Sequence, residues 1–289
     1  MRATGDLTRK KLQYYLPPNL LANRRLRPFP AERLGDALGV PFRHLDATAR
    51  EYLAWLAEVA PLHGGDGPFS KKPLEFFGTW RLLDPRPEDV FLDAAGGVFT
   101  YLDRLHVRQR YLHDLEIGPA LRERLGPGVG YLESDAAAIP LPDASVDKIS
   151  CHHSFEHFEG DADSGFIAEI QRLLRPGGRA CILPIFIGDA YYEVTTHFTL
   201  RGKRYDPAAR LLLDPTAQVP GGNGYARIYD PAALRRRVLD RVDRREFSVE
   251  IVELRLDGKP VPDLALERNR KVTRINCPFR ALLITRRAA

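Results

Sequence analysis

Three aspartates stand at the ends of three strand-like runs of the sequence. Asp93 ends the run VFLD, Asp114 ends RYLHD, and Asp135 ends VGYLESD. The carboxyl ends of neighbouring parallel strands meet at one edge of a sheet, so we expect these carboxylates to line a single crevice. Ionised carboxylates accept hydrogen bonds from hydroxyl and amino groups, and each such bond is worth about 1.5–3 kcal/mol. The three acids together are therefore suited to holding a nucleoside.

A turn of small residues follows the first aspartate, with the sequence Ala94, Ala95, Gly96, Gly97. Glycine adopts conformations that other residues avoid, and its lack of a side chain lets the backbone approach a ligand closely. An apolar strand that ends in an acid and then in small residues indicates a binding turn, because a simple reverse turn would need only the glycines.

Three histidines lie within six residues at the end of a fourth strand-like run. His152 and His153 end the run VDKISCHH, and His157 follows in SFEH. A neutral histidine accepts a proton near neutral pH, so a histidine beside a bound substrate is suited to general base catalysis. We expect His152 to contact the bound nucleoside, and His153 and His157 are the candidate catalytic bases.

The segment HSFEH (153–157) also matches the H-x-x-E-H pattern of one class of zinc hydrolases. That chemistry requires both histidines on one face of a long helix, and a third ligand from elsewhere. Because the segment directly follows a strand, an accidental match is favoured, and no metal is expected.

The elements that must position these residues alternate along the chain. Strands are predicted at 90–94, 110–114, 129–135, 146–152 and 179–186, with helices at 73–83, 98–106, 118–126 and 165–175. Such alternation with short connections is typical of an α/β protein with a doubly wound, mostly parallel sheet. Two further runs, 245–256 and 279–286, predict an antiparallel hairpin at the sheet edge, which makes seven strands.

Segments outside the alternation suggest additional parts. Residues 1–72 are predicted to form a mainly helical lid region, with a helix over 31–60 that is broken near Pro41. Residues 73–188 form the predicted core. Residues 189–231 interrupt the alternation and are rich in aromatic residues, so we expect a cap over the acceptor site. Residues 232–289 are predicted to supply a helix and the edge hairpin.

Over about residues 71–188, the chain resembles the class I S-adenosylmethionine-dependent methyltransferases, of the type 11-like group. In that family the first strand ends as D-x-G-x-G-x-G. Here Asp93 and Gly97 match that pattern, Gly96 fills a free position, and Ala95 and Phe99 replace glycines. Two later segments are also similar to family motifs, IPLPDASVD before the fourth strand and LLRPGGRACI before the fifth.

The resemblance implies a Rossmann-like fold, S-adenosylmethionine as the cofactor and S-adenosylhomocysteine as the product. In the family, the acid at the second strand end binds the ribose, which corresponds to Asp114 with Glu116 as a nearby rival. The acid after the third strand contacts the adenine and corresponds to Asp135. The implied cofactor-binding residues are Asp93, Ala94, Ala95, Gly96, Gly97, Asp114, Leu115, Asp135, Ala136 and His152.

Composition narrows the choice of acceptor. The net charge is +5, but 43 basic residues are interspersed with 38 acidic ones, which favours a small-molecule acceptor over a nucleic acid. An RNA or protein methyltransferase, and a protein that binds S-adenosylmethionine without methylating, remain alternatives. A nicotinamide-dependent dehydrogenase is disfavoured because AAGGVFTYL lacks the G-x-G-x-x-G fingerprint.

The location of the protein is predicted from its cysteines and apolar runs. Three cysteines without a C-x-x-C pair indicate reduced thiols in a cytoplasmic protein. No apolar run reaches the length of about 18 residues that a membrane span requires. A homodimer and a monomer are both compatible with the sequence.

Overall fold

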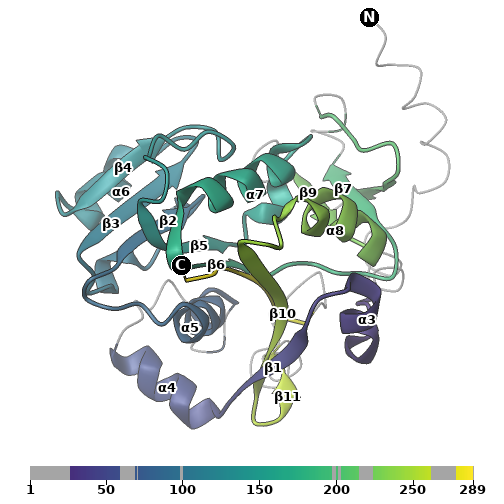
Figure 1. Cartoon of the computed structure of the whole chain (residues 1–289), viewed down its shortest axis with the longest axis horizontal. Coiled ribbons are helices and arrows are strands. Elements are labelled where there is room, and N and C mark those ends of the chain that lie inside the picture. The colour runs from purple at the N-terminus through teal and green to yellow at the C-terminus, as the bar shows by residue number, and fades with distance from the viewer. Residues whose placement is uncertain are drawn as a thin grey trace, which may run out of the picture.

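A mixed sheet runs through the middle of the structure, which is a computed structural model (Figure 1). The structure describes residues 27–58, 69, 71–97, 100–196, 200, 203–214, 224–261 and 278–288. Within these residues the sheet has nine strands, in the order β1-β10-β12-β6-β5-β2-β3-β4 with β11 paired to β10. The strands are β1 (Phe42–Ala47), β2 (Val90–Ala94), β3 (Gln109–Asp114), β4 (Val129–Glu133), β5 (Val146–His152), β6 (Leu174–Leu183), β10 (Phe247–Leu256), β11 (Lys259–Pro260) and β12 (Arg280–Arg286).

The order of the strands determines where a ligand can bind. The chain passes from β2 to β3 and β4 on one side, and then returns to β5 on the other side of β2. These four strands are parallel, so their carboxyl ends lie at the same edge of the sheet. A crevice forms at such a reversal because the connections leave β2 and β5 in opposite directions.

Helices cover both faces of the sheet (Figure 1). One face carries α4 (Ala49–Glu58), α5 (Lys71–Leu83) and α6 (Pro119–Leu125), and the other carries α3 (Leu34–Leu38), α7 (Ala162–Leu173) and α8 (Pro231–Arg237). Short 3-10 turns are η2 (Ala31–Arg33), η4 (Leu102–Arg104), η5 (Phe155–His157) and η6 (Leu239–Arg241). Strand residues alternate between the two faces: Phe91 packs with α5, and Leu92 packs with α7.

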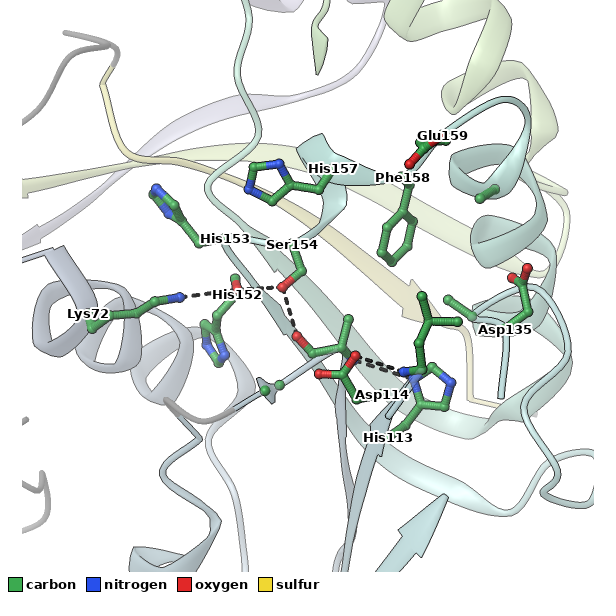
Figure 2. A pocket seen from close by; sticks show the side chains of 16 residues that line it. Lys72, His113, Asp114, Asp135, His152, His153, Ser154, His157, Phe158 and Glu159 are labelled. Carbon is green, nitrogen blue, oxygen red and sulfur yellow. Dashed lines mark hydrogen bonds between the residues drawn. The ribbon is translucent and has the colours of Figure 1, made fainter. Parts of the chain in front are cut away.

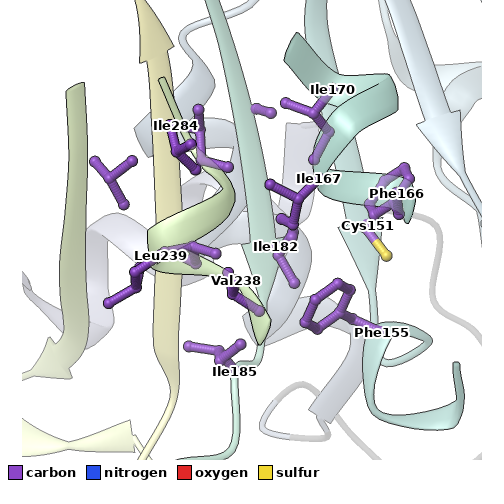
Figure 3. Packing of buried hydrophobic residues seen from close by; sticks show 14 of the residues in the cluster. Cys151, Phe155, Phe166, Ile167, Ile170, Ile182, Ile185, Val238, Leu239 and Ile284 are labelled. Atoms are coloured by element: carbon purple, nitrogen blue, oxygen red, sulfur yellow. The ribbon is translucent and has the colours of Figure 1, made fainter. Parts of the chain in front are cut away.

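The core beneath α7 shows why this helix forms. Phe166, Ile167 and Ile170 recur at helical spacing and pack against Cys151 of β5 and Ile182 of β6 (Figure 3). All five side chains are buried, and each large apolar side chain contributes about 1.5–3 kcal/mol on burial. The face of α7 therefore fixes the helix across β5 and β6, the strands that lead to the histidines.

A second, smaller sheet occupies part of the segment predicted as a cap. Its strands are β7 (Tyr192–Thr196), β8 (Arg210–Asp214) and β9 (Tyr225–Ile228), in the order β8-β7-β9. The cap residues 197–199, 201–202 and 215–223 lie outside the described residues.

A buried network of charges ties this second sheet to the core. The side chain of Arg227 on β9 is fully buried, and its guanidinium lies 2.6 Å from Asp163 Oδ2 and 2.9 Å from Glu193 Oε1. Arg237 of α8 donates a second hydrogen bond to Asp163, at 2.8 Å. Asp163 belongs to α7, and Glu193 belongs to β7. The network therefore joins the second sheet to α7, which packs on the main sheet.

The predicted α/β fold with a mostly parallel sheet is confirmed, and the N-terminal region departs from prediction. The helix predicted over 31–60 is wrong at Phe42–Ala47, which form β1 and pair in parallel with β10 from Ile251 to Leu256. Tertiary pairing along the whole segment outweighs its local preference. The β10–β12 pair is antiparallel as predicted. It does not form the edge of the sheet, because β1 pairs with the outer side of β10. Residues 1–26, 59–68 and 70 of the predicted lid region lie outside the described residues.

Two predicted helices also differ from the structure, one in its existence and one in its end. The helix predicted over 98–106 is wrong, because residues 100–106 contain only η4, and residues 98 and 99 are not described. The hydroxyl of Thr100 bonds to the carboxylate of Asp93 and to the backbone N–H of Leu102, which replaces helical backbone bonds. The helix α7 ends at Leu173, and the Pro-Gly-Gly segment (176–178) lies within β6.

We predict that Arg227→Met lowers the free energy of unfolding by about 3–5 kcal/mol, because it removes the cation beside the buried Glu193 and one of the two cations beside the buried Asp163. The matched control is Arg245→Met, which removes an ion pair of 2.7 Å from an arginine that is 90% exposed. That change should cost less than about 1 kcal/mol. Urea unfolding followed by circular dichroism measures both, and equal losses would contradict the structural role of the buried network.

Candidate functional site

A cavity of about 670 Å³ lies at the carboxyl ends of β2, β3, β4 and β5 (Figure 2). It brings together ten of the twelve predicted site residues, which are Ala95, Gly96, Gly97, Asp114, Leu115, Asp135, Ala136, His152, His153 and His157. Lys72, His113, Ser154, Phe158, Glu159 and Ala162 complete the lining. Residues from four strand ends and from α5 therefore meet around one space.

Asp93 and Ala94, which were predicted to bind the cofactor, lie beneath the cavity and do not line it. Asp93 is fully buried and accepts hydrogen bonds from Thr100 Oγ1 at 2.5 Å and from Ser150 Oγ at 2.7 Å. Burial alone would raise the pKa of Asp93, but its contacts with His152, Thr100 and Ser150 lower it below the ordinary value. The geometry gives this ionised carboxylate a supporting position under the turn.

The turn above Asp93 carries no side chain larger than a methyl group at residues 95–97. Ala95 and Gly97 adopt positive φ angles of 51° and 55°. A Cβ atom on Gly96 would lie 2.3 Å from Asp93 Oδ2 and 2.8 Å from Leu112 Cδ1, which leaves no room for any residue but glycine. The required glycine is thus Gly96, and Ala95 adopts the turn conformation without one.

His113, which the sequence did not single out, links the turn to the neighbouring strands. Its Nε2 donates to the carbonyl oxygen of Ser134 at 3.0 Å, so its Nδ1 is the acceptor for the backbone N–H of Ala95, at 3.4 Å. Burial lowers the pKa of His113, which keeps the ring neutral, as this pair of bonds requires.

Two of the predicted acids line the cavity together. Asp114 Oδ1 accepts the N–H of Leu115 at 2.7 Å, and its other oxygen lies beside Gly97. Burial raises the pKa of Asp114 above its ordinary value. Asp135 Oδ1 accepts the N–H of Ala137 at 2.8 Å and is otherwise open to the cavity. Glu116, the rival of Asp114, is exposed and does not line the cavity.

The histidines form the other end of the cavity, away from Asp135 (Figure 2). The ring of His152 is buried, with Nε2 2.8 Å from Thr79 Oγ1 and Nδ1 3.5 Å from Asp93. His153 and His157 are partly exposed to the cavity, at 19% and 23%. His152 therefore supports the site from within, whereas the other two residues line the cavity with partly exposed rings.

Sequence reasoning missed several contacts at this end. Glu75 of α5 is fully buried, and its Oε1 lies 2.6 Å from Nδ1 of His153. Its signal is an acid inside the apolar run LEFF, because charged residues are rarely buried without a partner. Lys72 and Ser154 approach the carbonyl oxygen of His152 at 3.3 and 3.0 Å. The Lys72 contact depends on how α5 docks, which no local motif encodes.

The zinc hydrolase alternative lacks the helix that it requires. Phe155–His157 form the 3-10 turn η5, so His153 and His157 do not project from one face of a long helix. Within the described part of the chain, no group of three or more histidine, cysteine, aspartate or glutamate side chains could hold a metal ion.

The lining fits an adenosyl group. Asp114 and Asp135 supply two separate carboxylates for hydroxyl and amino donors, and the turn at Gly96 and Gly97 leaves space for close approach. Leu115 is 75% exposed next to Asp114 and offers an apolar surface to a base.

Residues 93–182 match the family model of a methyltransferase domain. The match begins at Asp93 below the glycine turn and ends in β6, so it contains all four strand ends that surround the cavity. The part of the chain that surrounds the cavity is therefore similar to a methyltransferase domain, as the motifs predict, and the same motifs predict S-adenosylmethionine as the cofactor.

Individual relatives match parts of this chain. The ubiquinone/menaquinone biosynthesis C-methyltransferase UbiE of Acidiphilium cryptum is 32% identical over 108 residues, which is 34% of this chain and 43% of the relative. A phthiotriol/phenolphthiotriol dimycocerosates methyltransferase of Mycobacterium ulcerans is 37% identical over 90 residues, which is 29% of this chain and 31% of the relative. The chain thus matches less than half of the length of these curated relatives.

Solved structures are similar over a longer range. One of them is the 1,6-didemethyltoxoflavin-N1-methyltransferase of Burkholderia thailandensis, solved with 1,6-didemethyltoxoflavin and S-adenosylhomocysteine. It is 15% identical to this chain, and the match covers 95% of this chain and 100% of that protein, with a TM-score of 0.47.

In the residues that the structure describes, no helix has the length and apolar character needed to cross a membrane.

We predict that Gly96→Ala weakens binding of S-adenosylhomocysteine more than tenfold and costs about 1–3 kcal/mol of stability, because the new methyl group displaces Asp93 or Leu112. The control is Gly118→Ala, since a Cβ atom at Gly118 meets nothing within 4 Å. Isothermal titration calorimetry and urea unfolding measure the two effects. Wild-type affinity in Gly96→Ala would show that the turn does not shape the binding site.

Proposed function

We propose that this protein transfers the methyl group of S-adenosylmethionine to a small-molecule acceptor. The observation that carries the proposal is that one cavity joins the turn at Gly96, the acids Asp114 and Asp135, and the paired histidines His153 and His157. The first three features suit a nucleoside, and the histidines suit an acceptor that must lose a proton.

The residues of this chain divide the cavity into two parts. We infer that Asp114 holds the ribose hydroxyls, that Asp135 and Leu115 contact the adenine, and that the backbone at 95–97 borders the amino acid portion. When bound, the cofactor supplies an electrophilic methyl group whose bond to sulfur breaks with its electron pair left on sulfur. The protein then mainly has to align the acceptor, and such orientation is worth up to about 7–11 kcal/mol.

One contact joins the histidine end to the second sheet. Nδ1 of His157 contacts the backbone carbonyl oxygen of Tyr225 on β9, which supports the proposal that the segment 189–231 forms a cap. Phe158 adds an aromatic surface to the cavity lining. A partly apolar cavity with a few polar groups supports a small acceptor.

Charge pairing near the cavity supports a small acceptor over RNA. Lys72 is within 3.4 Å of Glu75, and Lys203 forms an ion pair with Glu159, so both cations are balanced by nearby acids. RNA binding draws on phosphate contacts by cationic side chains. The names of the relatives, which concern quinone biosynthesis and phthiotriol dimycocerosates, also support a small acceptor.

Location and assembly remain predictions. The buried thiols of Cys151 and Cys181 are free, and burial raises the pKa of Cys181 to about 12, which supports a cytoplasmic protein with inert thiols. Cys277 lies outside the described residues. A homodimer stays a prediction.

We predict that Asp114→Ala weakens binding of S-adenosylhomocysteine more than tenfold, because two charge-assisted hydrogen bonds to the ribose are lost. Asp135→Ala should weaken binding through the adenine end. The matched control is Glu116→Ala, which removes an exposed carboxylate two residues away and should leave the affinity unchanged. Calorimetry on the three variants is decisive, and unchanged affinity in Asp114→Ala would remove the ribose assignment.

We predict that the purified protein transfers radioactive label from S-adenosyl-[methyl-³H]methionine into the small-molecule fraction of a cell extract. Mass spectrometry of the labelled compound identifies the acceptor. Label in the RNA or protein fraction would favour the alternative classes. Binding of S-adenosylhomocysteine without any transfer would indicate a protein that binds the cofactor and does not methylate.

A further inference from the structure

A buried carboxylate reaches into the histidine end of the cavity from α5. Glu75 is fully buried on a helix whose neighbouring residues, Leu74, Phe76 and Phe77, belong to the apolar core. Burial alone would raise the pKa of Glu75, but the adjacent His153 and Lys72 lower it. Lys72 Nζ lies 3.4 Å from Glu75 Oε2, so a cation from the same helix balances the ionised carboxylate.

The partner of this carboxylate is one nitrogen of His153. Glu75 Oε1 lies 2.6 Å from Nδ1 in an ion-pair contact. An ionised carboxylate has only acceptor atoms, so we infer that Nδ1 carries the hydrogen. In the neutral ring, Nε2 is then the nitrogen with a free lone pair. His153 lines the cavity, and its Nε2 is 3.9 Å from Glu156, beyond hydrogen-bond distance.

The backbone of His153 is strained to reach this position. Its φ is +49°, a left-handed conformation that costs a non-glycine residue on the order of 1–3 kcal/mol. The N–H of His153 donates to the carbonyl oxygen of Leu183 at 3.2 Å, which holds the strained backbone against β6. Such strain persists where the surroundings over-determine it, and here it directs the ring towards Glu75.

The second histidine is held differently. Nδ1 of His157 contacts the backbone carbonyl of Tyr225, a neutral acceptor, and its Nε2 is 3.6 Å from Glu156 Oε1. A carbonyl fixes the ring but carries no charge to stabilise an imidazolium. An ionised carboxylate behind Nδ1 does both, so His153 is the better base of the two and His157 the better anchor for β9.

We propose that Glu75 is a positioning residue that holds His153 with Nε2 towards the acceptor, and that the acceptor carries a hydroxyl group on, or conjugated to, the atom that is methylated. This inference rests on the proposed function. The hydroxyl proton moves to Nε2 of His153, and the electron pair of the broken O–H bond becomes available to the acceptor atom that bonds to the methyl group. Glu75 stays ionised, and the imidazolium returns its proton to water after the product leaves.

The first test reads the ring directly and needs no acceptor. ¹⁵N NMR of histidine-labelled protein distinguishes the two neutral tautomers, because a bare ring nitrogen and an N–H nitrogen differ strongly in chemical shift. The wild type should show His153 with hydrogen on Nδ1, and Glu75→Gln should lose this single tautomer. The opposite tautomer in the wild type, or an unchanged spectrum in Glu75→Gln, would overturn the inference, and the wild-type spectrum decides even if the variant does not fold.

The second test separates positioning from stability. Glu75→Gln should lower label transfer into the cell extract by about 10²–10⁴-fold, while its affinity for S-adenosylhomocysteine stays within twofold of the wild type. The matched control is Glu253→Gln, another buried glutamate whose partner is Arg280 at 2.9 Å, far from the cavity lining. Full transfer by Glu75→Gln, or an equal loss in both variants, would contradict the role of Glu75.

The two proposals fail in distinguishable ways. A wild-type protein with the expected tautomer but no label transfer would leave the position of Glu75 intact and overturn the proposed function. Label transfer that does not depend on Glu75 would leave the proposed function intact and overturn the role of Glu75. Label found on an acceptor without a hydroxyl at or conjugated to the methylated atom would overturn the acceptor class.

Discussion

The fully buried carboxylate of Asp93 is the constraint on which the site depends. An ionised group removed from water costs several kcal/mol unless nearby donors satisfy it, and here Thr100 and Ser150 donate to its two oxygens. The space that the carboxylate occupies excludes a Cβ atom at Gly96. The glycine at this position of the turn is thus a consequence of the charge below it.

The same carboxylate joins the two halves of the site. His152 of β5 lies within 3.5 Å of Asp93, and its backbone carbonyl is approached by Lys72 from α5 and by Ser154. The hydroxyl of Ser154 is also 2.7 Å from the carbonyl of Ala95. The cofactor turn and the histidine segment are therefore connected by a continuous set of polar contacts. A change at either end alters the position of the other.

The sequence predicts those parts of the site that a strand end determines. Asp114 and Asp135 could be located because apolar runs stop at or just before them, and parallel strands bring such ends to one edge. Glu75 could not be located in the same way, since its distance from His153 depends on how α5 packs on β5 and β6. The strand at Phe42–Ala47 was missed for a similar reason, because its partner β10 lies more than 200 residues later in the chain. Local pattern thus predicts the acids and histidines at the strand ends, whereas the contacts that α5 makes with them require tertiary structure.

The network around Arg227 has a consequence for how the protein adapts to different acceptors. Asp163 of α7 pairs with Arg227 of β9 and Arg237 of α8, and His157 links η5 to β9. The small sheet therefore supports the histidine end of the cavity from behind, and none of its strand residues belongs to the lining. New acceptor shapes are accommodated more easily at lining residues such as Phe158 than in the small sheet, whose buried charges depend on one another.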